Sequence, residues 1–109
     1  MRKKRVYISG GITGNDNYLN DFRIIETKLR EHGFSAINPA TIQSYMPEDS
    51  TRHEYMMVSM ALMDMCDYVY MLPGWQTSTG ALAEYHYAKS CGMEVFDYNT
   101  RNKLLRMGV

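Results

Sequence analysis

Glu84 is the residue of this sequence best suited to covalent chemistry. It falls on a predicted helix over residues 79–90, where Gly80, Ala81 and Ala88 share one face with it because they lie three or four positions away. A carboxylate that projects over small residues can reach a substrate, and burial either raises its pKa or leaves it as an ionised nucleophile. The alternative is a solvated side chain, which is usual for a glutamate on a helix.

The loop before this helix, residues 73–78, ends in a serine. Ser78 stands where a helix N-cap belongs, and its hydroxyl together with the free N–H groups of a helix start can hold a phosphate. Capping alone would also explain the serine. Trp75, the only tryptophan of the chain, lies in the same loop. It either stacks on a base and closes a pocket, or it anchors the loop on the domain.

A second loop, residues 10–14, is rich in glycine. Gly10, Gly11 and Gly14 permit positive φ and a close approach of the backbone to a ligand, and the helix start that follows favours anions. Their spacing matches neither the dinucleotide-binding pattern nor the P-loop. The glycines therefore either cradle a ligand or simply permit a tight turn. Tyr7, just before them, points either into the site or into the core.

Short apolar segments alternate with helical patterns along the chain. The sequence predicts strands over residues 5–9, 34–37, 68–72 and 93–98, helices over about 18–32, 51–65, 79–90 and 100–107, and a polar loop over 43–50. This order predicts an α/β fold, a Rossmann-like or flavodoxin-like three-layer domain with a small parallel sheet in strand order 2-1-3-4. Ligands bind such sheets beyond the carboxyl ends of the strands, where the strand order reverses. We therefore expect the two loops to form the site together.

Length, charge and cysteine usage exclude several classes of protein. The 109 residues suffice for one domain, residues 1–109. Twelve Lys and Arg balance twelve Asp and Glu, which argues against a nucleic-acid partner. The first apolar strand is too short for a signal peptide or a membrane span, so we expect a cytoplasmic protein without a membrane partner. Cys66 and Cys91 lack metal or redox spacing, so we expect reduced, buried cysteines, no metal and no cofactor.

Four segments of the chain, taken together, resemble one known superfamily. They are Tyr-Ile-Ser-Gly-Gly-Ile-Thr-Gly at 7–14, Asn-Pro-Ala at 38–40, Cys-Asp-Tyr-Val-Tyr-Met-Leu-Pro-Gly-Trp at 66–75, and Ser78-x-Gly80-Ala81-x-x-Glu84. In this order they resemble the nucleoside 2-deoxyribosyltransferase superfamily, and within it a small uncharacterised branch of bacteria and phages similar to 2'-deoxynucleoside 5'-phosphate N-hydrolases. The resemblance covers about residues 5–98.

The resemblance implies cleavage of the N-glycosidic bond of nucleosides or of their 5'-monophosphates. It implies that Glu84 attacks the anomeric carbon and forms a glycosyl-enzyme intermediate, which water or a second base then resolves, as in retaining glycosidases. The resemblance also implies that Ser78 binds the 5'-phosphate. Tyr7 matches the tyrosine of the first strand, and Gly10 and Gly11 match the loop that follows it.

One position departs from the superfamily's pattern. The superfamily usually has an aspartate eight residues before the aspartate of the third strand, and counting back from Asp67 gives Ser59. A serine cannot replace a carboxylate as a general acid or base. With Glu84 as the catalytic residue, the expected substrate-binding residues are Tyr7, Gly10, Gly11, Ser59, Trp75, Ser78 and Gly80.

Two functions therefore stay open. The first is an enzyme, an N-glycosidase or deoxyribosyltransferase that acts on a small-molecule nucleoside or nucleotide; the second is a non-catalytic nucleotide sensor with the same pocket. A flavodoxin-like electron carrier is a third and weaker alternative. The resemblance also implies a homodimer or a larger homo-oligomer, with the Met- and Tyr-rich segment 55–65 as its interface.

Overall fold

The structure, a computed structural model, describes residues 2–12 and 16–108; Gly14 of the glycine-rich loop lies outside the described residues. Its four strands form one parallel sheet in the order β2-β1-β3-β4, as predicted. The strands are β1 (Arg5–Ser9), β2 (Ser35–Ile37), β3 (Tyr68–Met71) and β4 (Glu94–Phe96). Parallel neighbours need a crossover connection, and each connection here carries a helix.

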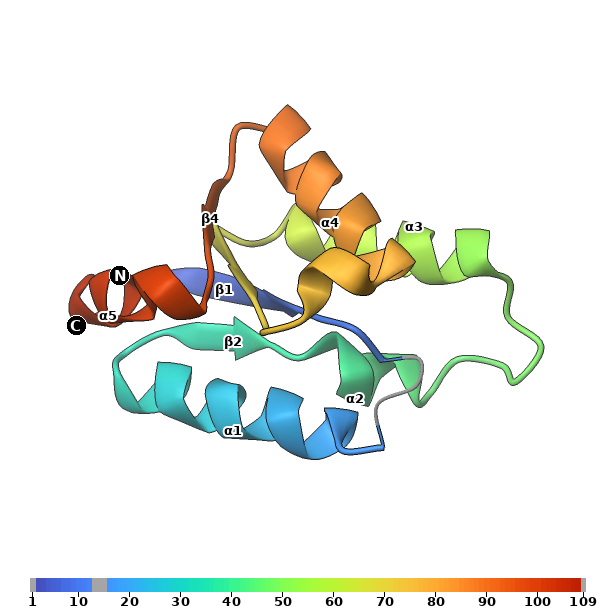
Figure 1. Ribbon diagram of the computed structural model, residues 1–109, viewed down its shortest axis with the longest axis horizontal. Helices are drawn as coiled ribbons and strands as arrows, with labels where there is room; N and C mark the ends of the chain where they lie inside the picture. The colour runs from blue at the N-terminus through green and yellow to red at the C-terminus, as the bar shows by residue number, and fades with distance from the viewer. Residues whose placement is uncertain (1, 13–15, 109) are drawn as a thin grey trace.

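The helices form a layer on each face of the sheet (Figure 1). They are α1 (Tyr18–Glu31), α2 (Pro39–Gln43), α3 (Arg52–Met63), α4 (Thr79–Ser90) and α5 (Arg101–Arg106), with short 3₁₀ turns at Trp75–Thr77 and Tyr98–Thr100. Buried side chains of α1 and α5 share one core cluster, and buried side chains of α3 and α4 share a second. This arrangement is the predicted three-layer fold.

The central strand β1 supplies both core clusters. Val6 and Ile8 belong to the cluster under α1, whereas Tyr7 belongs to the cluster under α3 and α4. Successive side chains of a strand point to opposite faces, so Ser9 shares the face of Tyr7. Both side chains are fully buried. The sequence of β1 thus delivers two hydroxyl groups to the face that α4 covers.

The signals that begin and end the helices are those expected from the sequence. Thr51 and Glu54 form a reciprocal capping box at the start of α3. Ser78 caps α4, since its Oγ accepts a hydrogen bond from the N–H of Ala81 at 3.2 Å. Gly33, which follows α1, has a φ of 92°.

The structure differs from the sequence prediction at α2. The residues after β2 were expected to run into a polar loop, but Pro39–Gln43 is helical. Asn38 caps this helix through its Oδ1, which accepts from the N–H of Ala40 at 3.0 Å, and Pro39 occupies the first helical position, where it needs no hydrogen bond. The Asn-Pro pair therefore begins a helix as well as ending a strand.

Two further observations concern the cysteines and the membrane. Cys66 is partly buried, but Cys91 is exposed at the end of α4, so the expectation that both are buried was wrong for Cys91. None of the helices in the described parts of the chain is both long and apolar enough to cross a membrane.

Candidate functional site

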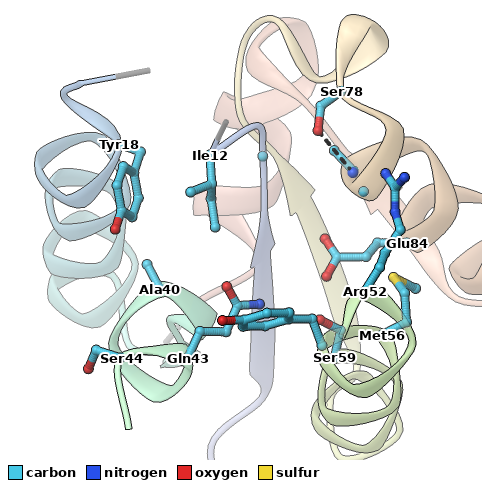
Figure 2. A pocket seen from close by; sticks show the side chains of 14 residues that line it. Ile12, Tyr18, Ala40, Gln43, Ser44, Arg52, Met56, Ser59, Ser78 and Glu84 are labelled. Carbon is cyan, nitrogen blue, oxygen red and sulfur yellow. Dashed lines mark hydrogen bonds between the residues drawn. The ribbon is translucent and has the colours of Figure 1, made fainter. Parts of the chain in front are cut away.

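A cavity of about 370 Å³ opens at the carboxyl end of the sheet. Its walls come from the loop after β1, from the start of α1, from α2, from α3 and from the start of α4 (Figure 2). This is the position predicted from the strand order, because β1 and β3 are neighbours and the chain leaves them in opposite directions. Besides the tyrosines Tyr18 and Tyr55, the polar residues that line the cavity are Gln43, Ser44, Arg52, Ser59, Ser78 and Glu84.

Glu84 lies at the inner end of this cavity, and its carboxylate points into it (Figure 2). Its side chain is only 7% exposed, so the alternative of a solvated helix glutamate was wrong. Both carboxylate oxygens accept hydrogen bonds: Oε2 from the hydroxyl of Tyr7 at 2.6 Å, and Oε1 from the hydroxyl of Ser9 at 2.6 Å. The donors come from β1 and the acceptor from α4, so the fold holds the carboxylate in one orientation.

The pKa of Glu84 is shifted by two opposing effects. Burial raises the pKa because it disfavours the charged form, whereas hydrogen bonds from Ser9, Tyr7 and Ser59 lower it because they favour the carboxylate. The first effect is larger, and the pKa lies above the ordinary value. The pKa of Tyr7 lies well above its ordinary value because of burial and the nearby carboxylate, so Tyr7 stays protonated and remains a donor.

The glycines bring the two predicted loops together. A Cβ atom on Gly11 would lie 3.2 Å from the Cβ of Ser78, and one on Gly10 would lie 2.9 Å from the Cβ of Leu72. The loop after β1 therefore needs its glycines to pack beside the segment that follows β3. Gly80 differs, because no atom lies within 4 Å of a Cβ built there, and it faces the cavity. The missing side chain of Gly80 leaves space that a ligand can use.

The predicted substrate-binding residues do not all reach the cavity. Gly10, Ser59, Ser78 and Gly80 line it, and Tyr7 contacts it through Glu84. Gly11 lies beside Ser78 and is not among the described lining residues.

Trp75 lies apart from the cavity. Its ring stacks on Tyr85, with the centroids 4.7 Å apart, and it packs against the core cluster under α3 and α4. Of the two alternatives that the sequence left open for Trp75, the structure therefore shows the loop anchor.

The two aspartates near β3 have structural contacts. Asp67 accepts a hydrogen bond from the backbone N–H of Arg5 at 2.8 Å, and Asp64 at the end of α3 accepts one from the hydroxyl of Tyr87 at 2.6 Å. Neither is among the described residues that line the cavity. In the described part of the chain, no three His, Cys, Asp or Glu side chains gather in a group that could hold a metal ion.

Ser9, Gln43 and Arg52 are among the residues of the site that sequence reasoning missed. Ser9 follows Tyr7 by two positions on a buried strand, and this spacing on one face was a signal for it. Gln43 was assigned to a loop because α2 was not predicted. Arg52 follows the recognised cap Thr51, and no motif marks it. Gln43 and Arg52 both line the cavity, from α2 and α3 respectively.

Comparison with known proteins adds a family without a described activity. No curated protein matches the chain. Residues 4–97 match the model of the family described as Domain of unknown function (DUF4406), and because the match spans most of the 109 residues, the chain belongs to this family.

Proposed function

We propose that this protein cleaves the N-glycosidic bond of a nucleoside or a nucleoside 5'-monophosphate, with Glu84 as the nucleophile. The observation that carries the proposal is a buried carboxylate at the inner end of a cavity, oriented by two hydroxyl donors. Among the described residues that line the cavity, Glu84 is the one carboxylate. The similarity of the segments around Tyr7, Ser78 and Glu84 to the nucleoside 2-deoxyribosyltransferases supports the same assignment.

The proposed reaction uses the carboxylate of Glu84 as the nucleophile. An oxygen of Glu84 attacks the anomeric carbon of the sugar, the bond between that carbon and the base nitrogen breaks, and its electron pair leaves with the base, which takes up a proton from solvent. The result is a glycosyl ester on Glu84. Attack by water on the same carbon breaks the ester bond, releases the sugar, restores the carboxylate and gives a proton to solvent; attack by a second base, which also loses a proton to solvent, transfers the sugar instead.

Tyr7 and Ser9 are positioning residues in this reaction. Each donates one hydrogen bond to Glu84, so the carboxylate cannot rotate freely, and its remaining lone pairs are left for the substrate. The same bonds favour the ionised form that a nucleophile needs, against the burial that raises its pKa.

A nucleotide sensor is the second candidate function, and Ser59 is the observation that favours it. Ser59 is 2% exposed and stands where the resembled superfamily has an aspartate. Its hydroxyl lowers the pKa of the Glu84 carboxyl, but a hydroxyl cannot protonate a leaving base as a carboxylic acid does. A protein of this kind would bind the nucleotide without turning it over.

We further propose that the protein forms a homodimer or a larger homo-oligomer through α3. Met57 on this helix is 56% exposed and Met65, just beyond its end, is 47% exposed, which leaves apolar surface uncovered. Light scattering of the wild type and of Met57→Glu tests this. A dimer that dissociates in the variant supports the interface, and a monomeric wild type contradicts it.

The activity is tested by chromatography. The protein is incubated with deoxynucleosides and nucleoside 5'-monophosphates, with and without a free acceptor base, and released or exchanged base is measured. Release without an acceptor indicates a hydrolase, and product that forms only with an acceptor indicates a transferase. Thermal stabilisation by a nucleotide without any product would reject the enzymatic function and support the sensor function.

The matched variants are Glu84→Gln and Glu94→Gln. Both remove one carboxylate, but Glu94 is exposed on β4 and is not among the described lining residues. Loss of turnover only in Glu84→Gln supports the nucleophile. Full turnover in that variant would reject it.

A further inference from the structure

Arg52 is a cation at the cavity that no other described residue neutralises. It is the first residue of α3, its side chain is exposed, and it lines the cavity. The structure gives it no ion pair and no hydrogen bond within the described chain. It is also the one Lys or Arg among the described lining residues.

The positive charge of Arg52 does not stabilise α3, the helix that begins with this residue. A positive charge on the first residue of a helix is repelled by the positive end of the helix dipole. The start of α3 is already satisfied by the capping box of Thr51 and Glu54. Removing the charge of Arg52 should therefore leave the stability of α3 unchanged or slightly improve it.

The start of α4, which lines the same cavity as Arg52, has groups that suit an anion. Figure 2 shows its guanidinium on the side of the cavity where Ser78 caps α4. Because Ser78 Oγ accepts from Ala81, its own proton is left to donate. The first N–H groups of α4, on Thr79 and Gly80, have no partner within the helix, and Gly80 leaves open space beside them.

The charge of Arg52 is not needed to hold the carboxylate of Glu84 in place. Its carboxylate oxygens take their hydrogen bonds from Tyr7 and Ser9, and Arg52 does not contribute to the shift of its pKa. The cavity thus has a carboxylate at its inner end and a separate cation at its rim. A nucleotide matches both, with the anomeric carbon at Glu84 and the phosphate at Arg52.

We propose that Arg52 binds the 5'-phosphate of the substrate and makes this site select nucleoside 5'-monophosphates over nucleosides. This inference rests on the proposed function and adds a specificity-determining residue to it. Guanidinium forms paired, charge-assisted hydrogen bonds with phosphate oxygens. Because the phosphate takes no part in the bond that breaks, Arg52 acts on KM and leaves kcat nearly unchanged.

The test compares Arg52→Gln and Arg52→Lys with wild type on pairs of a 2'-deoxynucleoside 5'-monophosphate and the same deoxynucleoside. Arg52→Gln should raise KM for the monophosphate about tenfold to a hundredfold, the effect of losing a hydrogen bond to a charged group. It should leave the nucleoside unaffected. Arg52→Lys should fall between, because lysine keeps the charge but not the paired donors. Arg106→Gln, an exposed arginine on α5, is the control for the change of net charge.

Each possible result either supports or overturns the proposal that Arg52 binds the 5'-phosphate. An equal effect on nucleoside and monophosphate, or no effect on either, overturns the inference. If wild type turns nothing over, calorimetry with the same monophosphates separates the two proposals. Binding that Arg52→Gln weakens retains Arg52 and rejects catalysis, whereas no binding rejects both. Thermal unfolding of each variant shows that a lost affinity is not a lost fold.

Discussion

The hydroxyl of Tyr7 donates a 2.6 Å hydrogen bond to Oε2 of Glu84, across 77 positions of the chain. The bond joins the central strand β1 to helix α4, and both side chains are buried. It exists only when the sheet has formed and α4 has packed on it. The orientation of the proposed nucleophile is therefore a property of the folded core.

Tyr7→Phe should lower kcat and move the pH profile. The change removes a hydrogen bond that favours ionised Glu84, so the pKa of Glu84 rises further. Activity, which needs the carboxylate, should fall about tenfold to a hundredfold at neutral pH. Its acidic limb should shift to higher pH in a kcat profile. Tyr45→Phe, at a residue 86% exposed, is the control, and an unshifted limb in Tyr7→Phe would show that this bond does not tune the nucleophile.

Glu84→Gln should make the protein more stable at neutral pH while it removes activity. The folded-state pKa of Glu84 is raised, so the folded state binds its proton more tightly than the unfolded state does. Stability of the wild type is therefore lost as pH rises from the ordinary value of 4.5 through the raised pKa. Denaturant titrations at several pH values should show an advantage of the variant that shrinks as pH falls through the raised pKa and is gone below pH 4.5. An advantage independent of pH would contradict this reading of Glu84.

Gly10→Ala and Gly80→Ala should have opposite effects. A methyl group at Gly10 meets Leu72 at 2.9 Å, and such overpacking costs about 1–3 kcal/mol of stability. A methyl group at Gly80 meets nothing within 4 Å and favours the helix by up to about 1 kcal/mol. It fills ligand space, however, and should raise KM about tenfold. Thermal unfolding and KM values check the pair, and an unchanged KM in Gly80→Ala would place the substrate elsewhere.

Trp75→Ala should affect stability and spare nucleotide binding. The ring stacks on Tyr85 and packs on the core, so its loss should cost about 1–2 kcal/mol. Because the ring does not line the cavity in the described structure, the dissociation constant for a nucleotide should stay within about twofold of wild type. Calorimetry of the folded variant measures it. A large loss of affinity would return Trp75 to the binding site.

The order of strands and the position of the cavity could be predicted because they depend on local patterns. Alternating apolar strands and helical periodicity leave few right-handed parallel topologies, and β1 and β3 must then be neighbours. Caps such as Ser78 and Thr51 act within one turn of chain, so sequence signals located the starts of α3 and α4 correctly. The short helix α2 was not predicted, because the Asn38-Pro39 signal was assigned only to the end of a strand.

The arrangement of side chains around the cavity depends on contacts between distant segments of the chain. The sequence by itself determined that Glu84 lies on a helix beside a glycine-rich loop. Only the tertiary structure showed that this glutamate is buried and accepts hydrogen bonds from Ser9 and Tyr7. It also showed that Trp75 stacks on Tyr85 and that Arg52 lines the cavity. The physical reason is that burial and hydrogen bonding arise from packing between β1, α3 and α4, and no local pattern encodes how those three surfaces meet.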